Sequence, residues 1–403
     1  MTTSAPAPRS SAPPSLRERL DAVLPVAPGP SPDSPRRAAL LEAVARLPEL
    51  SEADPQAPYT ALGELAAAGL LAECVPQDFG GAEPVPSLRA LCTVRAALAY
   101  RAPLYDLMFV MQGLGSYAVT RAGTGEQRRA YLPAVASGRA IAAVALTEPE
   151  AGSDLAGIRT RAARTDDGYV LDGEKVFISN AGLATHYVLY ARTDEHPKKG
   201  LTALLVPADS PGLSVEPMAL LCDDHPIGRL RFAGVRLPAS ARIGDEGQGM
   251  TLALTTLELF RPSVGAAAVG MARRALDEAL VHVQRRQQFG QPLASFQATQ
   301  LALAEMATDV EAAALLVGRA AQLADAGAAT GPSSAMAKLF ATEAAQRTVD
   351  RALQLLGGVG LLRGSVMERL YRDVRALRIY EGTSEIQKLI IARALLAPAD
   401  AKG

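Results

Sequence analysis

The order of hydrophobic patterns along the chain is the feature that most constrains its fold. Apolar residues recur at helical spacing from about residue 36 to 140. Between 141 and 243, short runs rich in β-branched and aromatic residues alternate with Gly, Asp and Pro turns. From 244 the helical pattern returns and continues to about 397. We therefore predict an α+β fold with an N-terminal helical domain, a central β-domain or barrel, and a C-terminal helical bundle.

The central strands should pair mainly with sequence neighbours, because no helix-length segment separates them and a parallel βαβ sheet is disfavoured. We expect strands at Ile141–Leu146, Tyr169–Leu171, Val176–Ile178, Tyr187–Ala191, Thr202–Val206, Leu213–Val215 and Leu230–Phe232. Residues 1–35 are rich in Ala, Pro and Ser, so we expect a flexible tail with a short helix at Leu16–Leu24. In the C-terminal part, Ser333 or Ser334 is a candidate N-cap.

Composition excludes several function classes. Lys and Arg total 41, Asp and Glu total 42, and the net charge is −1, which disfavours binding to nucleic acid or to an anionic membrane through bulk charge. Three cysteines and four histidines without ligand spacing predict neither a disulfide framework nor a metal site. With no run of 18 apolar residues and no secretion signal, we expect a cytoplasmic protein.

Common nucleotide and hydrolase motifs are absent. The chain has no GxGxxG after a strand, no P-loop and no GxSxG elbow. Gly357-Gly358-Val359-Gly360 follows a helix, so taken alone it is a helix C-cap and turn. Two polar segments remain as candidate sites, Leu146–Asp154 and Tyr380–Glu385. On composition alone, Glu148 and Asp154 would be turn and cap residues, and Thr383 or Ser384 would cap a helix from Ile386.

These segments belong to a longer series that carries a family resemblance. The sequence resembles the acyl-CoA dehydrogenase family from about residue 36 to 397. Seven matching segments occur in the family's order: Pro76–Gly81, Leu146–Asp154 (LTEPEAGSD), Leu171–Asn180 (LDGEKVFISN), Arg285–Gly290 (RRQQFG), Phe296-Gln297-Ala298, Gln354–Gly360 (QLLGGVG) and Ile379–Arg393 (IYEGTSEIQKLIIAR). The resemblance implies a helical domain, a β-barrel-like domain and a four-helix-bundle domain, in agreement with the periodicity.

The resemblance also implies a reaction. The family binds FAD and removes two hydrogens from Cα and Cβ of an acyl thioester, giving a 2-enoyl thioester. Glu381 matches the base that removes the α-proton, while the β-hydrogen leaves as hydride to flavin N5. Some relatives carry the base just before an Arg-Pro pair, but here that position is Phe260, which cannot accept a proton.

Further site residues are implied by their match to family positions. For the flavin these are Leu146, Thr147, Ser153, Phe177, Ser179, Arg286, Gln288, Phe289, Gln354, Gly358, Thr383 and Glu385. For the acyl thioester they are Ser153, Arg261, Tyr380 and Gly382. As single residues, most of these would be ordinary surface or packing residues.

The resemblance implies partners as well. Arg286 and Gln354 match positions that serve the FAD of a neighbouring subunit, which implies a homo-oligomer, a tetramer or a dimer. The expected substrate is an acyl-CoA or an acyl-carrier-protein thioester, and the expected electron acceptor is electron-transferring flavoprotein. Residues alone leave open an oxidase, a monooxygenase of the same fold, or a non-catalytic binding protein.

Two segments depart from the family pattern. Leu220–Arg229 replaces a KxGxRxS-like stretch, and Tyr100–Phe109 is bulkier than the small-residue helix of many relatives and contains Pro103. Both could touch the substrate or its carrier, so the acyl group is not specified by the sequence.

Overall fold

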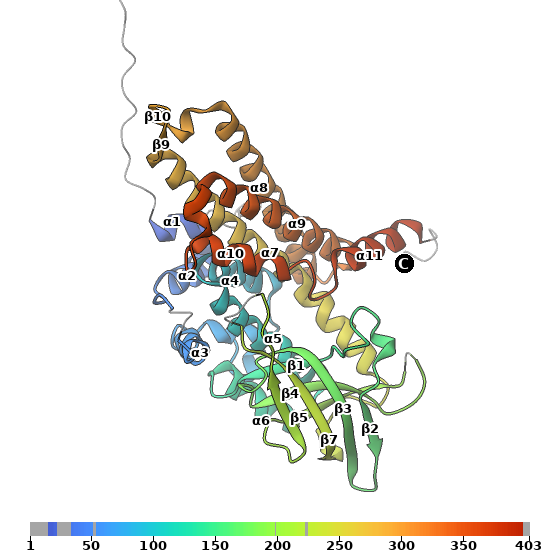
Figure 1. Cartoon of the computed structure of the whole chain (residues 1–403). Helices are drawn as coiled ribbons and strands as arrows, with labels where there is room; N and C mark the ends of the chain where they lie inside the picture. Colours follow the sequence, from blue (N-terminus) through green and yellow to red (C-terminus); the bar gives the residue numbers. More distant parts are fainter. Residues whose placement is uncertain (1–14, 22–33, 51–53, 198, 222–224, 398–403) are drawn as a thin grey trace, which may run out of the picture.

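The computed structural model describes residues 15–21, 34–50, 54–197, 199–221 and 225–397. Helices of the N-terminal part lie between a sheet and a second set of long helices (Figure 1). This order confirms the predicted fold class of helices, then strands, then helices. Within the described residues, no helix is long and apolar enough to cross a membrane.

The N-terminal part contains six helices in the described residues. They are α1 (Leu16–Asp21), α2 (Ser34–Ala45), α3 (Ala57–Ala67), α4 (Leu88–Arg101), α5 (Pro103–Ala122) and α6 (Gly125–Ala136). Helix α1 falls where a short helix was expected within the tail, and Leu20 is fully buried in the core that includes α2. This segment is therefore packed rather than extended. The rest of the predicted tail, residues 1–14 and 22–33, lies outside the described residues.

The central part forms one eight-stranded sheet in the described residues. Its strands are β1 (Ala142–Ala145), β2 (Arg161–Arg164), β3 (Gly168–Ser179), β4 (His186–Arg192), β5 (Leu201–Pro207), β6 (Leu213–Pro217), β7 (Ile227–Pro238) and β8 (Arg242–Ile243). The spatial order is β6-β7-β3-β2-β4-β5-β8, with β1 also paired to β4. Most neighbours are antiparallel; β4 pairs in parallel with β1 and β2.

Two details of the sheet differ from the sequence prediction. The expected strands at 169–171 and 176–178 are parts of the single strand β3, which bends where its register to β7 shifts at two places. The short strands β2 and β8 were not predicted. Strand β2 reads Arg-Ala-Ala-Arg and β8 has only two residues, so neither shows apolar alternation.

The C-terminal part is a set of long helices. They are α7 (Gly249–Arg285), α8 (Gln297–Asp325), α9 (Gly331–Leu356), α10 (Val366–Ala376) and α11 (Ser384–Leu396), with a small hairpin of β9 (Gln287–Gln288) and β10 (Gln291–Pro292) after α7. Helix α9 begins after Thr330, so the candidate N-caps Ser333 and Ser334 are wrong: both lie inside its first turn.

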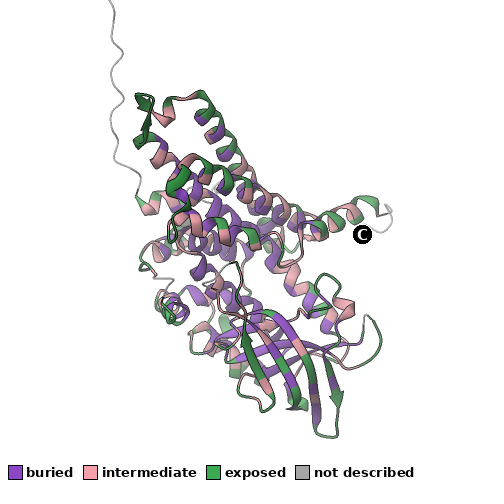
Figure 2. Ribbon diagram, viewed as in Figure 1, coloured by how far each residue is buried: buried purple, intermediate pink, exposed green. Residues whose placement is uncertain are grey.

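Small residues allow α7 to pack closely against its neighbours. A Cβ atom at Gly270 would lie 2.1 Å from the carbonyl oxygen of Ala96 in α4, and one at Gly265 would lie 3.2 Å from the carbonyl oxygen of Ala337 in α9. The buried residues concentrate where these helices meet (Figure 2). The apolar side chains of the N-terminal and C-terminal helices form one continuous core, and the sheet has a second core of its own.

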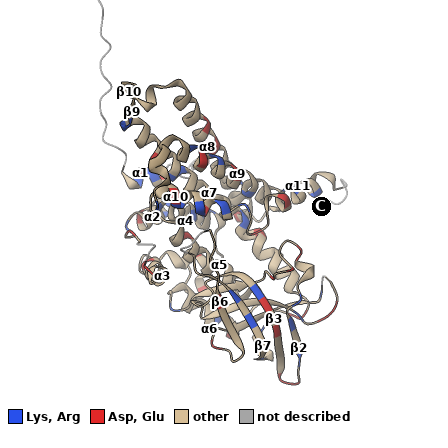
Figure 3. Ribbon diagram, in the orientation of Figure 1, with Lys and Arg blue, Asp and Glu red and all other residues tan. Residues whose placement is uncertain are grey.

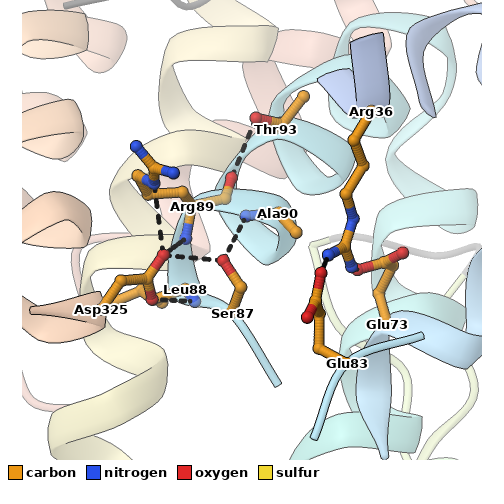
Figure 4. Close-up of polar contacts among 9 residues, drawn as sticks. All are labelled: Arg36, Glu73, Glu83, Ser87, Leu88, Arg89, Ala90, Thr93 and Asp325. Carbon is orange, nitrogen blue, oxygen red and sulfur yellow. Dashed lines mark hydrogen bonds and ion pairs between the residues drawn. The ribbon is translucent and has the colours of Figure 1, made fainter. Parts of the chain in front are cut away.

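A carboxylate from α8 joins the two helical parts. Asp325 accepts hydrogen bonds from the backbone N–H of Leu88 (2.7 Å) and Arg89 (3.2 Å) and from Ser87 Oγ (2.7 Å), all at the start of α4 (Figure 4). A negative charge there satisfies unpaired N–H groups and interacts favourably with the helix dipole. On the other side of Figure 4, Arg36 of α2 pairs with both Glu73 and Glu83.

The Asp325 contact generates a stability prediction. We expect Asp325→Ala to lower the free energy of unfolding by about 1–2 kcal/mol, as for the loss of a helix cap. Asp309→Ala, on the same helix, removes only the exposed ion pair with Arg347 and should cost less than about 1 kcal/mol. Urea unfolding at fixed protein concentration measures both. Equal losses would mean that Asp325 acts as an ordinary surface charge.

Candidate active site

Glu381 lies in the loop between α10 and α11, with its carboxylate directed into the protein. The residue is half-buried, and its Oε2 is buried without a hydrogen-bond partner among the described residues. Its backbone is left-handed, with a φ of 52°, and Gly382 follows with a φ of 90°. A non-glycine residue in this conformation costs roughly 1–2 kcal/mol. An unpaired, shielded carboxylate on a strained backbone is typical of a reactive group rather than of a surface turn.

Charged residues from four helices surround this carboxylate. Burial raises the pKa of Glu381, and the positive charges of Arg95, Lys338 and Arg261 oppose that shift. Arg95 is itself buried and forms a two-pronged ion pair with Asp106, at 2.7 and 2.8 Å. These cations therefore favour the carboxylate form, but burial outweighs them and leaves Glu381 more basic than an ordinary glutamate.

Arg261 is a predicted substrate residue from a distant part of the chain that the structure brings to Glu381. It lies on α7, is 6% exposed, and has a buried Nε without a hydrogen-bond partner among the described residues. Burial lowers its pKa, while Glu381 and Glu258 oppose the shift. Phe260, the preceding residue, packs its ring on Gly113 and makes an edge contact with Tyr117, both of α5. That position therefore offers no proton acceptor, as the sequence indicated.

The loop places several other predicted residues beside Glu381. Thr383 caps α11 by accepting a hydrogen bond from Ile386 N–H (3.3 Å), which confirms one of the two N-cap candidates. A side chain at Gly382 is disfavoured by its φ of 90°, and its Cβ would lie 2.7 Å from Gln387 Nε2. Tyr380 is 40% exposed, and Glu385 is exposed in the first turn of α11.

A second group of predicted residues lies at the end of β1 and on β3. The Val176 N–H donates to the Thr147 carbonyl at 2.9 Å, so Leu146 and Thr147 lie alongside β3. Phe177 has a φ of 58° and is 55% exposed, at the register shift where β3 bends; Ser179 ends the strand. An exposed aromatic ring next to hydroxyl groups can stack on a flat heteroaromatic ligand and donate hydrogen bonds to it.

A buried ion pair joins β3 to the segment Leu146–Glu148 that follows β1. Lys175 is fully buried and donates to the Leu146 carbonyl (2.9 Å) and to Glu148 (2.8 Å). Glu148 also accepts from the backbone N–H groups of Arg159 (2.6 Å) and Thr160 (2.9 Å). Burial acts to raise the pKa of Glu148, but Lys175 and these donors outweigh it and lower the pKa. Glu148 is thus a turn residue, as composition alone indicated, but its carboxylate is buried and paired with Lys175.

The third group lies far from the other two. Arg286 follows α7, and Gln288 and Phe289 belong to the β9–β10 hairpin, which lies at the opposite end of the structure from the sheet (Figure 1). Arg261 and Arg286 are separated along one continuous helix by about 38 Å. Phe289 is 92% exposed and has a φ of 52°. One copy of the chain therefore does not bring this group to Glu381 or Phe177.

The remaining predicted residues are exposed. Gln354 lies in the last turn of α9, and Gly358 lies in the turn after the helix with open space where a Cβ would be. Gly357 has a φ of 61° and caps α9, in agreement with the C-cap interpretation of this segment. Ser153 is exposed beside Asp154, whose side chain caps a short turn.

Backbone strain coincides with the predicted site. Among the described residues, the non-glycine positions with positive φ are Phe177, Asn180, Phe289 and Glu381. Three of these four were selected from the sequence as cofactor or catalytic residues. Such conformations persist where the surrounding structure enforces them, and they concentrate at functional sites. The φ values played no part in the selection of these residues, so they are independent support for the site.

The sequence interpretation missed the buried charges beneath both sites. Arg95, Asp106, Lys338 and Lys175 are all buried, and none was selected. A signal did exist for Arg95, Asp106 and Lys338, since each is a charged residue within an apolar helical segment, where charges are rarely buried unless paired. Lys175 follows Asp172, Gly173 and Glu174 and gave no such signal. Their partners are distant in sequence, so the pattern alone could not identify the pairing.

Both segments that depart from the family pattern connect elements: Tyr100–Phe109 joins α4 to α5, and Leu220–Arg229 leads from the loop after β6 into β7. Tyr100–Phe109 spans the end of α4 and the start of α5, which are broken at Ala102 because Pro103 cannot continue α4. Part of Leu220–Arg229, residues 222–224, lies outside the described residues. Among the described residues, no group of three or more His, Cys, Asp or Glu could hold a metal ion.

Comparison with known proteins decides the family. The N-terminal, middle and C-terminal domains of acyl-CoA dehydrogenases match residues 33–139, 143–235 and 247–396. The chain belongs to the acyl-CoA dehydrogenase family. Its homologues and structural neighbours include acyl-CoA dehydrogenases, which are oxidoreductases.

Individual relatives cover almost the whole chain. The chain is 37% identical to cyclohexane-1-carbonyl-CoA dehydrogenase of Geobacter metallireducens, over 82% of this chain and 87% of that protein. Butyryl-CoA dehydrogenase of Megasphaera elsdenii superposes with a TM-score of 0.83 at 27% identity, covering 96% of this chain and all of that one. PigA, solved with FAD and proline, superposes with a TM-score of 0.81 at 28% identity, over 96% and 98% of the two chains.

The residues present fit an FAD, the cofactor of this family. Phe177 offers an exposed ring, and Thr147 and Ser179 offer hydroxyl groups. The exposed Arg286 suits a diphosphate, because a guanidinium can donate two parallel hydrogen bonds to it. The open space at Gly358 allows a ligand to approach the backbone.

The Glu148–Lys175 pair generates the second prediction. We expect Lys175→Met to lower the free energy of unfolding by about 3–5 kcal/mol, because Glu148 would keep a buried charge without its partner. The double variant Glu148→Gln with Lys175→Met removes both charges and should be more stable than Lys175→Met alone. Urea unfolding of the wild type, both single variants and the double variant measures the coupling. Strictly additive losses would show that the two side chains do not act as a pair.

Proposed function

We propose that this protein dehydrogenates an acyl-CoA thioester between Cα and Cβ, with Glu381 as the base that removes the α-proton. The observation that carries the proposal is the Glu381 carboxylate, which is buried, unpaired at Oε2 and surrounded by Arg95, Lys338 and Arg261. A carboxylate with a raised pKa is a stronger base than an exposed one, and the nearby cations favour its ionised form against the effect of burial. The assignment of the family supports the acyl thioester as substrate class.

Each of the following residues has a separate role in the proposed dehydrogenation. Glu381 accepts the α-proton, and its own backbone N–H is the protein donor that we assign to the thioester carbonyl, where negative charge develops. Phe177, Thr147 and Ser179 hold the flavin ring, and Leu146 lies beside it. When bound, the flavin supplies the hydride acceptor for Cβ. The buried Phe260 and the partly buried Tyr117 present hydrocarbon on the α7 side of the site and would exclude water there.

The quaternary arrangement is part of the proposal. Arg286, Gln288 and Phe289 lie too far from Phe177 to serve the flavin of their own chain, yet they are exposed at the end of α7. We propose that they, with Gln354 and Gly358, contact the FAD of a neighbouring copy in a homo-oligomer. Basic and acidic residues are dispersed over the helices and the sheet (Figure 3), so contact between copies would not rest on one strongly charged face. Electron-transferring flavoprotein is the proposed electron acceptor.

Substitution of the base tests the reaction. We expect purified protein to absorb near roughly 450 nm, as flavins do, and to form 2-enoyl-CoA from one member of an acyl-CoA chain-length series. Glu381→Gln should keep the flavin and lower kcat by at least about 10²- to 10⁴-fold, the range of a general base. Near-normal turnover of Glu381→Gln would refute the assignment of the base.

The same assay separates the alternatives. Faster turnover of acyl groups on a carrier protein would make the carrier thioester the substrate. Hydrogen peroxide formed in air, in proportion to enoyl product, would identify an oxidase. Protein that purifies without flavin would favour a binding protein.

The pKa of Glu381 gives a pH prediction. Because burial raises this pKa, the carboxylate form should be lost at a higher pH than for an ordinary glutamate, whose pKa is about 4.3. We expect kcat/KM to fall as the pH decreases through that raised value and to be independent of pH just above it. A pH–rate profile, with a stability control at each pH, measures this fall of kcat/KM at low pH, the acidic limb of the profile. A limb at or below the value of an exposed glutamate would contradict the buried environment.

A further inference from the structure

The loop that carries Glu381 needs contacts that enforce its conformation. Glu381 and Gly382 both have positive φ, at 52° and 90°. For glutamate this conformation is unfavourable, and the loop would relax if nothing held it. The position of the carboxylate therefore depends on whatever fixes the adjoining peptide groups.

Two donors meet at the carbonyl oxygen of Gly382. Lys338 Nζ donates at 2.7 Å, and Gln387 Nε2 donates at 2.8 Å. Gln387 Nε2 also lies 3.4 Å from the carbonyl oxygen of Glu381. Lys338 comes from α9 and Gln387 from α11, and both side chains are fully buried. The peptide group next to Glu381 is thus fixed from two helices.

Helix α9 contacts the loop at a second point. Glu343 accepts a hydrogen bond from Ser384 Oγ at 2.6 Å and forms an ion pair with Arg378 at 2.9 Å. Arg378 precedes Glu381 and Ser384 follows it, so Glu343 and Lys338 together fix the loop on both sides. The loop therefore takes its position from α9.

A neutral side chain could donate the same hydrogen bond, so the choice of lysine needs a reason. An ammonium group is expensive to bury unless negative charge faces it. Burial lowers the pKa of Lys338 to about 8; Glu381 opposes that shift, Arg261 of α7 adds to it, and Glu343 of α9 and Glu385 of α11 oppose it. Around Glu381, the further charges are Arg95 of α4 and Asp106 of α5. The ammonium group of Lys338 therefore lies next to the loop of Glu381, whose negative charge stabilises it.

We propose that Lys338 is a positioning residue for the proton abstraction: its ammonium group fixes the Gly382 carbonyl, and so the Glu381 backbone, and its charge favours the carboxylate form of Glu381. This inference rests on the proposed function, in which Glu381 removes the α-proton. Lys338 is expected to touch neither substrate nor flavin.

The test follows proton abstraction without turnover. A 3-thia-acyl-CoA has an acidic α-proton but carries sulfur at the β-position, so it can exchange its α-proton yet cannot lose a hydride. Mass spectrometry of deuterium uptake at Cα in D₂O measures the exchange rate as a function of pH. The holoenzyme is compared with Lys338→Met, Gln387→Leu and Lys388→Met, with kcat and KM for the best acyl-CoA measured in parallel.

The three variants separate geometry from charge. Lys338→Met should slow exchange and kcat by roughly 10- to 100-fold, leave KM within about twofold, and move the acidic limb upward by roughly one pH unit. Gln387→Leu removes a neutral donor from the same carbonyl, so the rate should fall while the limb stays. Lys388→Met removes an exposed charge of α11 and should behave as wild type. Should Lys338→Met fail to fold with bound flavin, Lys338→Gln takes its place, with the same expected shift of the limb.

The outcomes distinguish this inference from the proposed function. A wild-type exchange rate in the Lys338 variant overturns the inference. Slower exchange without a shift of the acidic limb also overturns it, because Lys338 would then have only a packing role. Glu381→Gln serves as the reference. If it still exchanges the α-proton, the proposed function itself fails; if it does not, while the Lys338 variant is normal, only this inference fails.

Discussion

The close approach of α7 to α4 and α9 is the constraint on which the candidate active site depends. Gly270 meets the backbone of Ala96, the residue after Arg95, and Gly265 meets the backbone of Ala337, the residue before Lys338. Arg261 lies one turn before Gly265 on the same helix. Small residues at these contacts therefore bring positive charges from three helices to one loop. A larger side chain at either glycine would separate the helices and change the charge balance around Glu381.

In the sheet, a buried ion pair rather than close helix packing fixes the backbone of the predicted site residues. The predicted residues there are the exposed ring of Phe177 and the hydroxyl groups of Thr147 and Ser179. These uncharged groups depend on a fixed backbone for their positions. The buried Glu148–Lys175 pair supplies that fixed backbone, because Lys175 also donates to the Leu146 carbonyl and Glu148 accepts from two N–H groups on the segment before β2. Both parts of the molecule thus bury charge close to functional backbone, where satisfied polar networks specify one local conformation.

Periodicity and motifs predicted most of the architecture but not its internal charges. The helical, β and helical parts follow from apolar spacing, and Glu381 and Phe177 follow from the family motifs. Strands β2 and β8 carry too few apolar residues to show a period. Helix α9 begins at Gly331, after Thr330, because the Gly331-Pro332 pair opens the helix before the serines. Arg95, Asp106 and Lys338 were missed since burial of a charge depends on partners that only the tertiary fold supplies.

The left-handed backbone at Phe177, Phe289 and Glu381 has a consequence for engineering this protein. Glycine adopts that conformation without steric cost, so replacing any of these residues with glycine would relieve local strain. A screen that selects only for resistance to heat would therefore favour losing the very side chains that the proposed site uses. Selection for stability and selection for catalysis act in opposite directions at these positions, and natural sequences that retain all three side chains are under selection for more than folding.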